Sequence, residues 1–260
     1  NLFNRFFAAG FYYKTFMGIP PFEWGKGTKI WMFYEKFIRK AAGMGKSSRK
    51  ADPDKYEHVH DYCDILIVGS GSSGRAAALK AAEHKLDVLL IEQDSKIGGN
   101  SLNEKNIDIS KELLELENNG IRIMTRATVF GLYDSEVVGV LERVTDHYSN
   151  PSKYDPRQRF WTIRSKHIIL ATGAIERHIA FGNNDLPGIM NVSAARIYLN
   201  RFGILPGKKI VVCTNNDSAY LTAKELSKAG AEVKLFDVRS EIDNQLRDAI
   251  LKDGILLQMN

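Results

Sequence analysis

Three glycines spaced for a phosphate-binding turn are the clearest chemical feature of this chain. Gly69, Gly71 and Gly74 follow the apolar run at residues 65–68 in the pattern G-x-G-x-x-G. In a strand-turn-helix unit the first glycine permits the tight turn, the second lets the backbone approach a pyrophosphate, and the third allows close packing of helix on strand. A helix predicted at residues 74–84 would point its free amides and positive dipole end at that anion.

A carboxylate completes the pattern. Glu92 ends the apolar strand predicted at residues 88–92 and lies 18 residues after Gly74. There it can accept hydrogen bonds from both ribose hydroxyls and would repel a 2′-phosphate. The complete order of strand, turn, helix, strand and acid favours a site for the ADP half of a dinucleotide over an ordinary glycine-rich turn. FAD and NAD share that ADP group, so these residues leave both open. Arg75 would lie near the phosphates or simply be solvated, and solvation is at least as good an interpretation.

A second strand-turn-helix pattern lacks the glycines. Strands at 209–213 and 232–237 flank a helix at 219–229, but the turn Thr214-Asn-Asn-Asp-Ser-Ala219 contains no glycine. Side chains would keep a pyrophosphate away from this backbone, and Asp217 at the helix start would repel it. We therefore predict one functional dinucleotide site, the first.

The elements that must position this site indicate an α/β fold. We predict a Rossmann-like dinucleotide-binding domain with an inserted β-meander, followed by the start of a second Rossmann-like domain, as in two-dinucleotide-binding-domain flavoproteins. Between the two patterns we expect a helix at 110–118, a third parallel strand at 121–125, and meander strands at 129–133, 137–144 and 160–164, with a hairpin turn at Asp134-Ser135. An apolar strand at 167–171 then runs into Thr172-Gly173, at the carboxyl ends of the sheet. The expected domains are 1–60, 61–206 with the meander at about 126–165, and 207–260.

The N-terminal segment differs in composition from the rest. Residues 1–60 carry 11 Lys and Arg against 5 Asp and Glu, and residues 1–42 hold 13 of the 26 aromatic residues. So aromatic a segment should pack on the core or on a partner. No nucleic-acid motif accompanies its basic charge, no apolar run has the length of a membrane span, and no signal peptide is visible. The chain begins with Asn, so we expect a piece of a longer product.

Other reactive side chains give weak signals. Cys63 and Cys213 form no C-x-x-C pair, which argues against a dithiol reductase and fits a reducing cytoplasm. His58, His60 and Cys63 offer only three metal ligands without a second cluster, so we predict no metal site. No nucleophile–base pair is evident, and we predict no catalytic acid or base in this chain.

The chain resembles the alpha subunit of heterotetrameric sarcosine oxidase along nearly its whole length, as a middle segment of that subunit. The stretches that carry the resemblance are Ala9-Gly-Phe-Tyr-Tyr-Lys-Thr-Phe-Met17, Ile38-Arg-Lys-Ala-Ala-Gly43, Asp52-Pro-Asp-Lys-Tyr56, Val140-Leu-Glu-Arg-Val-Thr-Asp-His147, Ala171-Thr-Gly-Ala-Ile-Glu-Arg177, Asn183-Asn-Asp-Leu-Pro-Gly188, Tyr198-Leu-Asn-Arg201 and Thr214-Asn-Asn-Asp-Ser-Ala-Tyr220. Two departures are Ser72-Ser73, where the family usually has Pro-Ala, and His178, where it usually has Pro.

The resemblance implies a cytoplasmic oxidoreductase complex with beta, gamma and delta subunits. Such a complex demethylates sarcosine to glycine with oxygen, giving hydrogen peroxide and formaldehyde or methylene-tetrahydrofolate. It implies a tightly bound NAD⁺ on this chain, FAD and covalent FMN on the beta subunit or at its interface, and a folate site in a C-terminal part absent here. The implied nucleotide-binding residues are Gly69, Gly71, Ser72, Ser73, Gly74, Glu92, Gln93, Gly98, Gly99, Thr128, Val129, Thr172 and Gly173. A plain surface turn remains the alternative for Gly98-Gly99.

Two rival functions remain. A self-sufficient FAD- and NAD(P)H-dependent oxidoreductase of the same fold would need a working second glycine motif, which this chain lacks. A purely structural interaction protein would not need the intact first motif.

Overall fold

The computed structural model describes residues 36–37, 39–43, 45, 48–104 and 107–260. The chain divides into two units, Asn1–Pro53 and Asp54–Asn260. In the first unit, residues 36–37 and 39–41 are helical among those described. Most of the aromatic segment predicted to pack on the core or a partner lies outside the described residues. The predicted nucleotide site belongs to the second unit.

A six-stranded mixed sheet forms the first part of that unit, in the order β3-β2-β1-β6-β5-β4. Its strands are β1 (Tyr56–Val68), β2 (Val88–Ile91), β3 (Arg122–Met124), β4 (Ala127–Tyr133), β5 (Val137–Arg143) and β6 (Gln158–Leu170). Strands β3, β2, β1 and β6 run parallel, whereas β4, β5 and β6 form an antiparallel meander. The predicted Rossmann-like fold with an inserted meander is confirmed.

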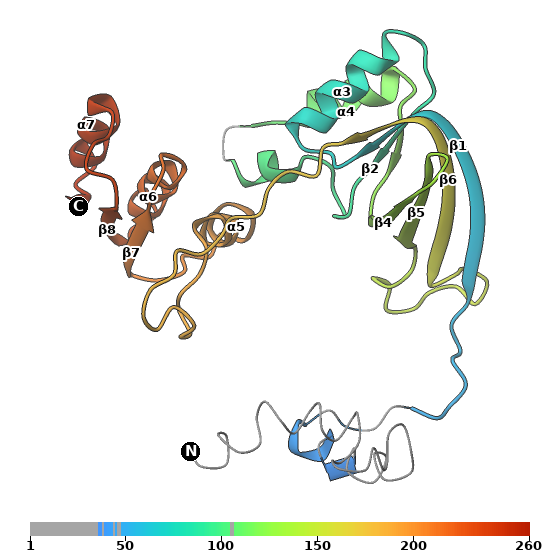
Figure 1. Cartoon of the computed structure of the whole chain (residues 1–260), viewed down its shortest axis with the longest axis horizontal. Helices are drawn as coiled ribbons and strands as arrows, with labels where there is room; N and C mark the ends of the chain where they lie inside the picture. The colour runs from blue at the N-terminus through green and yellow to red at the C-terminus, as the bar shows by residue number, and fades with distance from the viewer. Residues whose placement is uncertain (1–35, 38, 44, 46–47, 105–106) are drawn as a thin grey trace, which may run out of the picture. The chain divides into compact units, whose positions relative to one another are not determined.

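Strand β2 and the end of β1 are continuously apolar because both faces of the sheet are covered there. Helices α3 (Ser72–Ala82) and α4 (Ser110–Asn118) lie over one face (Figure 1), where Ile67 and Leu90 pack against Ala78 and Leu116. On the other face, the alternate residues of β1 and β2 share a core with the meander; this core contains Leu66, Val68, Leu89, Ile91, Val138, Val140 and Ile163. A short 3₁₀ helix, η1 (Gly99–Asn103), follows β2.

Two strands are longer than the sequence predicts. β1 begins at Tyr56 rather than at residue 65, and the strands expected at 160–164 and 167–171 are one continuous strand, β6. The two pair in parallel from Tyr56↔Gln158 to Val68↔Leu170. The polar residues that suggest a break find partners within this ladder, since the Lys166 ammonium lies 2.8 Å from the Asp64 carboxylate.

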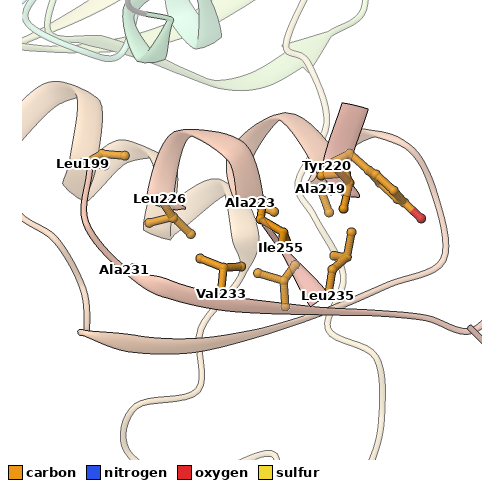
Figure 2. Close-up of a cluster of buried hydrophobic side chains, with 11 residues drawn as sticks. Leu199, Ala219, Tyr220, Ala223, Leu226, Ala231, Val233, Leu235 and Ile255 are labelled. Carbon is orange, nitrogen blue, oxygen red and sulfur yellow. The ribbon is translucent and has the colours of Figure 1, made fainter. Parts of the chain in front are cut away.

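A second parallel sheet, in the order β7-β8-β9, follows the long loop after β6. Its strands are β7 (Lys209–Thr214), β8 (Glu232–Asp237) and β9 (Leu256–Met259), connected by α6 (Ser218–Lys228) and α7 (Asn244–Lys252) and preceded by α5 (Val192–Phe202). Figure 2 shows their shared core, in which Tyr220 and Leu226 of α6 lie over Val233 and Leu235 of β8. The predicted start of a second Rossmann-like unit is confirmed, while α5, α7 and β9 had no clear sequence signal.

No helix in the described part of the chain combines the length and the apolar character needed to cross a membrane.

Candidate functional site

The first and third glycines are required by packing within the chain itself. Gly69 has a φ of +99°, a left-handed conformation that side chains rarely adopt, and a Cβ there would collide with the carbonyl oxygen of Ala171. A Cβ on Gly74 would collide with the carbonyl oxygen of Gly69. The turn after β1 therefore packs directly against α3 and against the chain leaving β6.

The second glycine is different, because nothing in the described part of the chain requires it. Gly71 has an ordinary φ of −61°, and a Cβ built on it would meet no atom within 4 Å. Gly99 lies beside it, with its ideal Cβ position 3.0 Å from the Gly71 Cα. The open space next to Gly71 is where a pyrophosphate would approach the backbone.

The start of α3 suits an anion. Gly71 is its N-cap, no side chain caps its amides, and its first turn contains no acidic residue. Ser72 and Ser73, the first two helical residues, are exposed. The unpaired amides of a first turn and the positive end of the helix dipole together attract phosphate. The site thus fits a dinucleotide on geometry as well as on sequence pattern.

Glu92 is buried at the carboxyl end of β2, next to the glycine turn. Its Oε2 accepts hydrogen bonds from the Ser70 amide at 3.0 Å and the Ser70 hydroxyl at 2.5 Å, and its Oε1 accepts from the Asp94 amide at 2.9 Å. A carboxylate offers about four lone-pair positions. These three donors leave room on Oε1 for one ribose hydroxyl rather than two. The role of Glu92 as a ribose acceptor stays a prediction.

Arg75 is buried, so of the two interpretations left open by the sequence the solvated one is wrong. Its side chain is only 3% exposed, and its Nε lies 2.6 Å from a carboxylate oxygen of Glu112 on α4. The guanidinium also donates to the carbonyl oxygens of Ser70 and Gly98 at 2.9 and 3.1 Å, and to the Ser101 hydroxyl at 3.3 Å. It joins α3, α4 and both glycine turns.

The remaining predicted residues surround the same turn at different distances. The ideal Cβ position of Gly69 lies 3.4 Å from the Thr172 Cα, and Gly173 has a φ of +73° that favours glycine. Gly98 is buried, and its amide donates to the Ser70 hydroxyl at 3.0 Å. The plain surface turn that was the alternative for Gly98-Gly99 does not fit this packing.

The other three predicted residues make their contacts elsewhere. Gln93 is exposed, and its carbonyl accepts a hydrogen bond from Arg143 at 2.5 Å. Thr128 and Val129 lie on β4 directly after Ala127, whose amide donates to the Glu92 carbonyl at 2.9 Å. Val129 packs into the core between sheet and meander, whereas Thr128 is exposed. A role for these three in nucleotide binding stays a prediction.

In the turn between β7 and α6, which corresponds to the glycine turn between β1 and α3, side chains fill the space. The Asn216 Oδ1 accepts from the amide and hydroxyl of Ser218 at 3.0 and 2.6 Å. Arg239 bridges Asp217 at the helix start and Asp237 at the end of β8, at 2.8 and 2.7 Å. Asp237 corresponds in position to Glu92, but Tyr220 also donates to it at 2.8 Å.

These contacts also favour the charged form of Asp237. Burial alone would raise the pKa of Asp237, but the hydrogen bonds from Arg239 and Tyr220 outweigh it and lower that pKa. Burial, together with the hydrogen bond to Asp237, raises the pKa of Tyr220 to about 12. The carboxylate that could face a ribose here is already engaged; that this turn binds no dinucleotide stays a prediction.

Groups suited to acid–base, nucleophilic or metal chemistry are not gathered in the described residues. Burial raises the pKa of the Cys63 thiol to about 12, so it is no nucleophile at neutral pH. His58 pairs with the Thr162 hydroxyl at 2.9 Å. No group of three or more His, Cys, Asp or Glu side chains in the described part of the chain is placed to hold a metal ion.

The sequence pattern did not indicate Ser70 or Ser101, and it left Arg75 open between a position near the phosphates and a solvated one. Ser70 is fully buried and joins Glu92 to Gly98. The one signal in the sequence for the role of Arg75 was its position directly after the third glycine, on the predicted first turn of a helix otherwise rich in alanine. Its acidic partner, Glu112, lies 37 residues away on another helix.

Comparison with known proteins places the chain in an oxidoreductase family. Residues 63–260 match the family described as pyridine nucleotide-disulphide oxidoreductase. The chain is 42% identical over 244 residues to sarcosine oxidase subunit alpha of Rhizobium meliloti (strain 1021), covering 90% of this chain and 24% of that protein. It is 39% identical over 228 residues to the corresponding subunit of Corynebacterium sp. (strain U-96), covering 82% and 23%. The chain therefore spans about a quarter of the length of these relatives.

A solved structure supports the fold. L-proline dehydrogenase from P. horikoshii superposes with a TM-score of 0.55 at 25% identity, covering 76% of this chain and 40% of that one.

Proposed function

Because the chain belongs to the pyridine nucleotide-disulphide oxidoreductase family, we propose that it is the NAD-binding portion of the alpha subunit of a sarcosine oxidase complex. The observation that carries the proposal is the open space at Gly71, between the uncapped start of α3 and Gly99, with Glu92 beside it. A glycine that the packing of the chain does not require leaves room for a pyrophosphate to approach the backbone.

The cofactor of this site is NAD⁺ rather than its 2′-phosphorylated form. The Glu92 carboxylate at the end of β2 would accept a ribose hydroxyl and repel a phosphate. The nucleotide is held tightly and does not turn over, because the flavins that oxidise the substrate are expected on another subunit of the complex. When bound, the dinucleotide would stabilise the glycine turns and the start of α3.

The redox chemistry belongs to other parts of the complex. FAD and covalent FMN are placed on the beta subunit or at its interface, gamma and delta subunits complete a cytoplasmic heterotetramer, and tetrahydrofolate binds a C-terminal part of the alpha subunit. The complex oxidises sarcosine with oxygen and water to glycine, formaldehyde and hydrogen peroxide. In the presence of the folate, the methyl carbon leaves as methylene-tetrahydrofolate. The similarity to the two sarcosine oxidase alpha subunits supports this assignment.

The rival, a self-sufficient FAD- and NAD(P)H-dependent oxidoreductase, is disfavoured by the second turn. A nicotinamide dinucleotide there would have to displace the bridge of Arg239 to Asp217 and Asp237.

The test is to purify the full chain with its partners, release nucleotides with acid, and identify them by chromatography and mass spectrometry. We expect about one NAD⁺ per alpha chain, not reduced when sarcosine is added. Recovery of FAD from the alpha chain, or of no nucleotide, would overturn the proposal.

A further inference from the structure

We propose that Arg75 is a positioning residue that orients the amides of the pyrophosphate cradle without touching the nucleotide. The inference rests on the function proposed above and deepens it. Arg75 lies in the first turn of α3 and is almost completely buried. Two of its four contacts are to backbone carbonyls, those of Ser70 and Gly98, one in each glycine turn.

Those two carbonyls determine where two amides point. A peptide unit is planar and trans, so its N–H and its C=O point in opposite directions. The Ser70 carbonyl shares a peptide unit with the Gly71 amide, and the Gly98 carbonyl shares one with the Gly99 amide. By holding both carbonyls, the Arg75 guanidinium turns both amides away from itself.

The two amides belong to one place in the fold. The ideal Cβ position of Gly99 lies 3.0 Å from the Gly71 Cα and 3.3 Å from its nitrogen, so the two peptide units are adjacent. No acceptor for either amide is found among the described residues. Unpaired backbone amides gathered beside a helix start are donors that bind phosphate.

Glu112 fixes the guanidinium in this orientation. Its carboxylate accepts a hydrogen bond from the Arg75 Nε at 2.6 Å, while Nη1 donates to the two carbonyls and Nη2 donates to the Ser101 hydroxyl. The fork of an arginine can serve all of these at once, whereas a lysine has a single nitrogen. Glu112 is 44% exposed, so it can be changed with little effect on the core.

The experiment compares a ligand with phosphates and one without. ADP and adenosine are titrated by calorimetry into the nucleotide-depleted full chain, as parent and as Arg75→Leu. We expect the Kd for ADP to rise at least tenfold, because only ADP uses the oriented amides, while the Kd for adenosine changes less than twofold. Unchanged ADP affinity, or an equal loss for both ligands, would overturn the inference.

Two milder variants keep the test decisive if Arg75→Leu does not fold. Arg75→Lys and Glu112→Gln should each weaken ADP binding severalfold and leave adenosine binding unchanged; no effect of either would contradict the proposal. Arg122→Leu is the matched control, because Arg122 forms a two-point pair with Asp87, both distances being 3.1 Å, and Asp87 precedes β2 at the end of the strand opposite the glycine turns. It should change neither Kd. If the parent chain binds neither ADP nor adenosine, the proposed function fails. If the parent binds ADP but Arg75→Leu binds it equally well, only the inference about Arg75 fails.

Discussion

Replacing Gly71 with valine should abolish nucleotide binding while leaving the fold intact. The Gly71 backbone has a φ of −61° and a ψ of −179°, which valine adopts readily, and no atom lies within 4 Å of the new Cβ. The cost to folding is then that of an unfavourable N-cap residue, on the order of 1 kcal/mol.

The cost to binding is much larger. The valine side chain would fill the space through which a pyrophosphate approaches the backbone, so at least two charge-assisted hydrogen bonds would be lost. At about 1.5–3 kcal/mol each, the loss is roughly 3–6 kcal/mol, or about 10²- to 10⁴-fold in Kd.

The assay measures bound nucleotide after acid release and the thermal unfolding midpoint of the same preparation. Gly182→Val is the matched control, because Gly182 also has open space around its Cβ position and no positive φ, but lies in a loop away from the site. It should keep both nucleotide and stability. A Gly71→Val protein that is folded and still carries a full complement of nucleotide would refute the reasoning.

Gly74→Ala should instead destabilise the fold by about 1–3 kcal/mol or more, since its Cβ would collide with the Gly69 carbonyl oxygen; urea unfolding without nucleotide measures this, and a loss below about 0.5 kcal/mol would contradict it. Asp237 has a lowered pKa in the folded state, so its contribution to stability is present above its unfolded pKa of about 3.9 and is lost as the pH falls through the folded value. Asp237→Asn should therefore give a urea midpoint that is lower at pH 7 and falls less between pH 5 and pH 2 than that of the parent; parallel curves would argue against it. Glu92→Gln removes the charge that repels a 2′-phosphate, so the ratio of the Kd for NADP⁺ to that for NAD⁺ should fall by about tenfold in calorimetry, and an unchanged ratio would exclude Glu92 as the selector. Leu116→Ala empties a fully buried site on α4 and should cost about 2–5 kcal/mol in urea unfolding; a cost under 1 kcal/mol would mean that α4 packs more loosely than described.

The sequence predicted those features that depend on residues close together in the chain. The spacing of Gly69 and Gly74 implied close backbone packing, and the structure places each of them against a carbonyl group. The glycine-free turn at Asn216 likewise implied side chains where a phosphate would lie. In both cases a few neighbouring residues determine the local geometry.

Features set by distant residues were not predictable in the same way. The burial of Arg75 depends on α4 bringing Glu112 across 37 residues of sequence. The continuity of β6 through Ser165 and Lys166 depends on pairing with β1, which begins about a hundred residues earlier. Local polarity there suggested a break, and the long-range ladder overrode it.

The long pairing of β1 with β6 has a consequence for how the nucleotide site forms during folding. Tyr56 and Gln158 are partners at the start of the ladder although they lie 102 positions apart in the sequence. Closing a loop of that length costs about 4 kcal/mol of chain entropy before any contact compensates it. Folding limited by such non-local pairing is slow compared with that of helices and hairpins.

The glycine turn is therefore synthesised early but completed late. Gly69 packs against Ala171, and the Ala171 amide donates to the Val68 carbonyl at 2.8 Å, so the turn lacks one wall until the end of β6 has emerged and paired. A nascent chain that ends before β6 would contain the whole G-x-G-x-x-G motif and still be unable to hold the dinucleotide. Nucleotide capture should thus be a late step of folding that reports on the completed sheet.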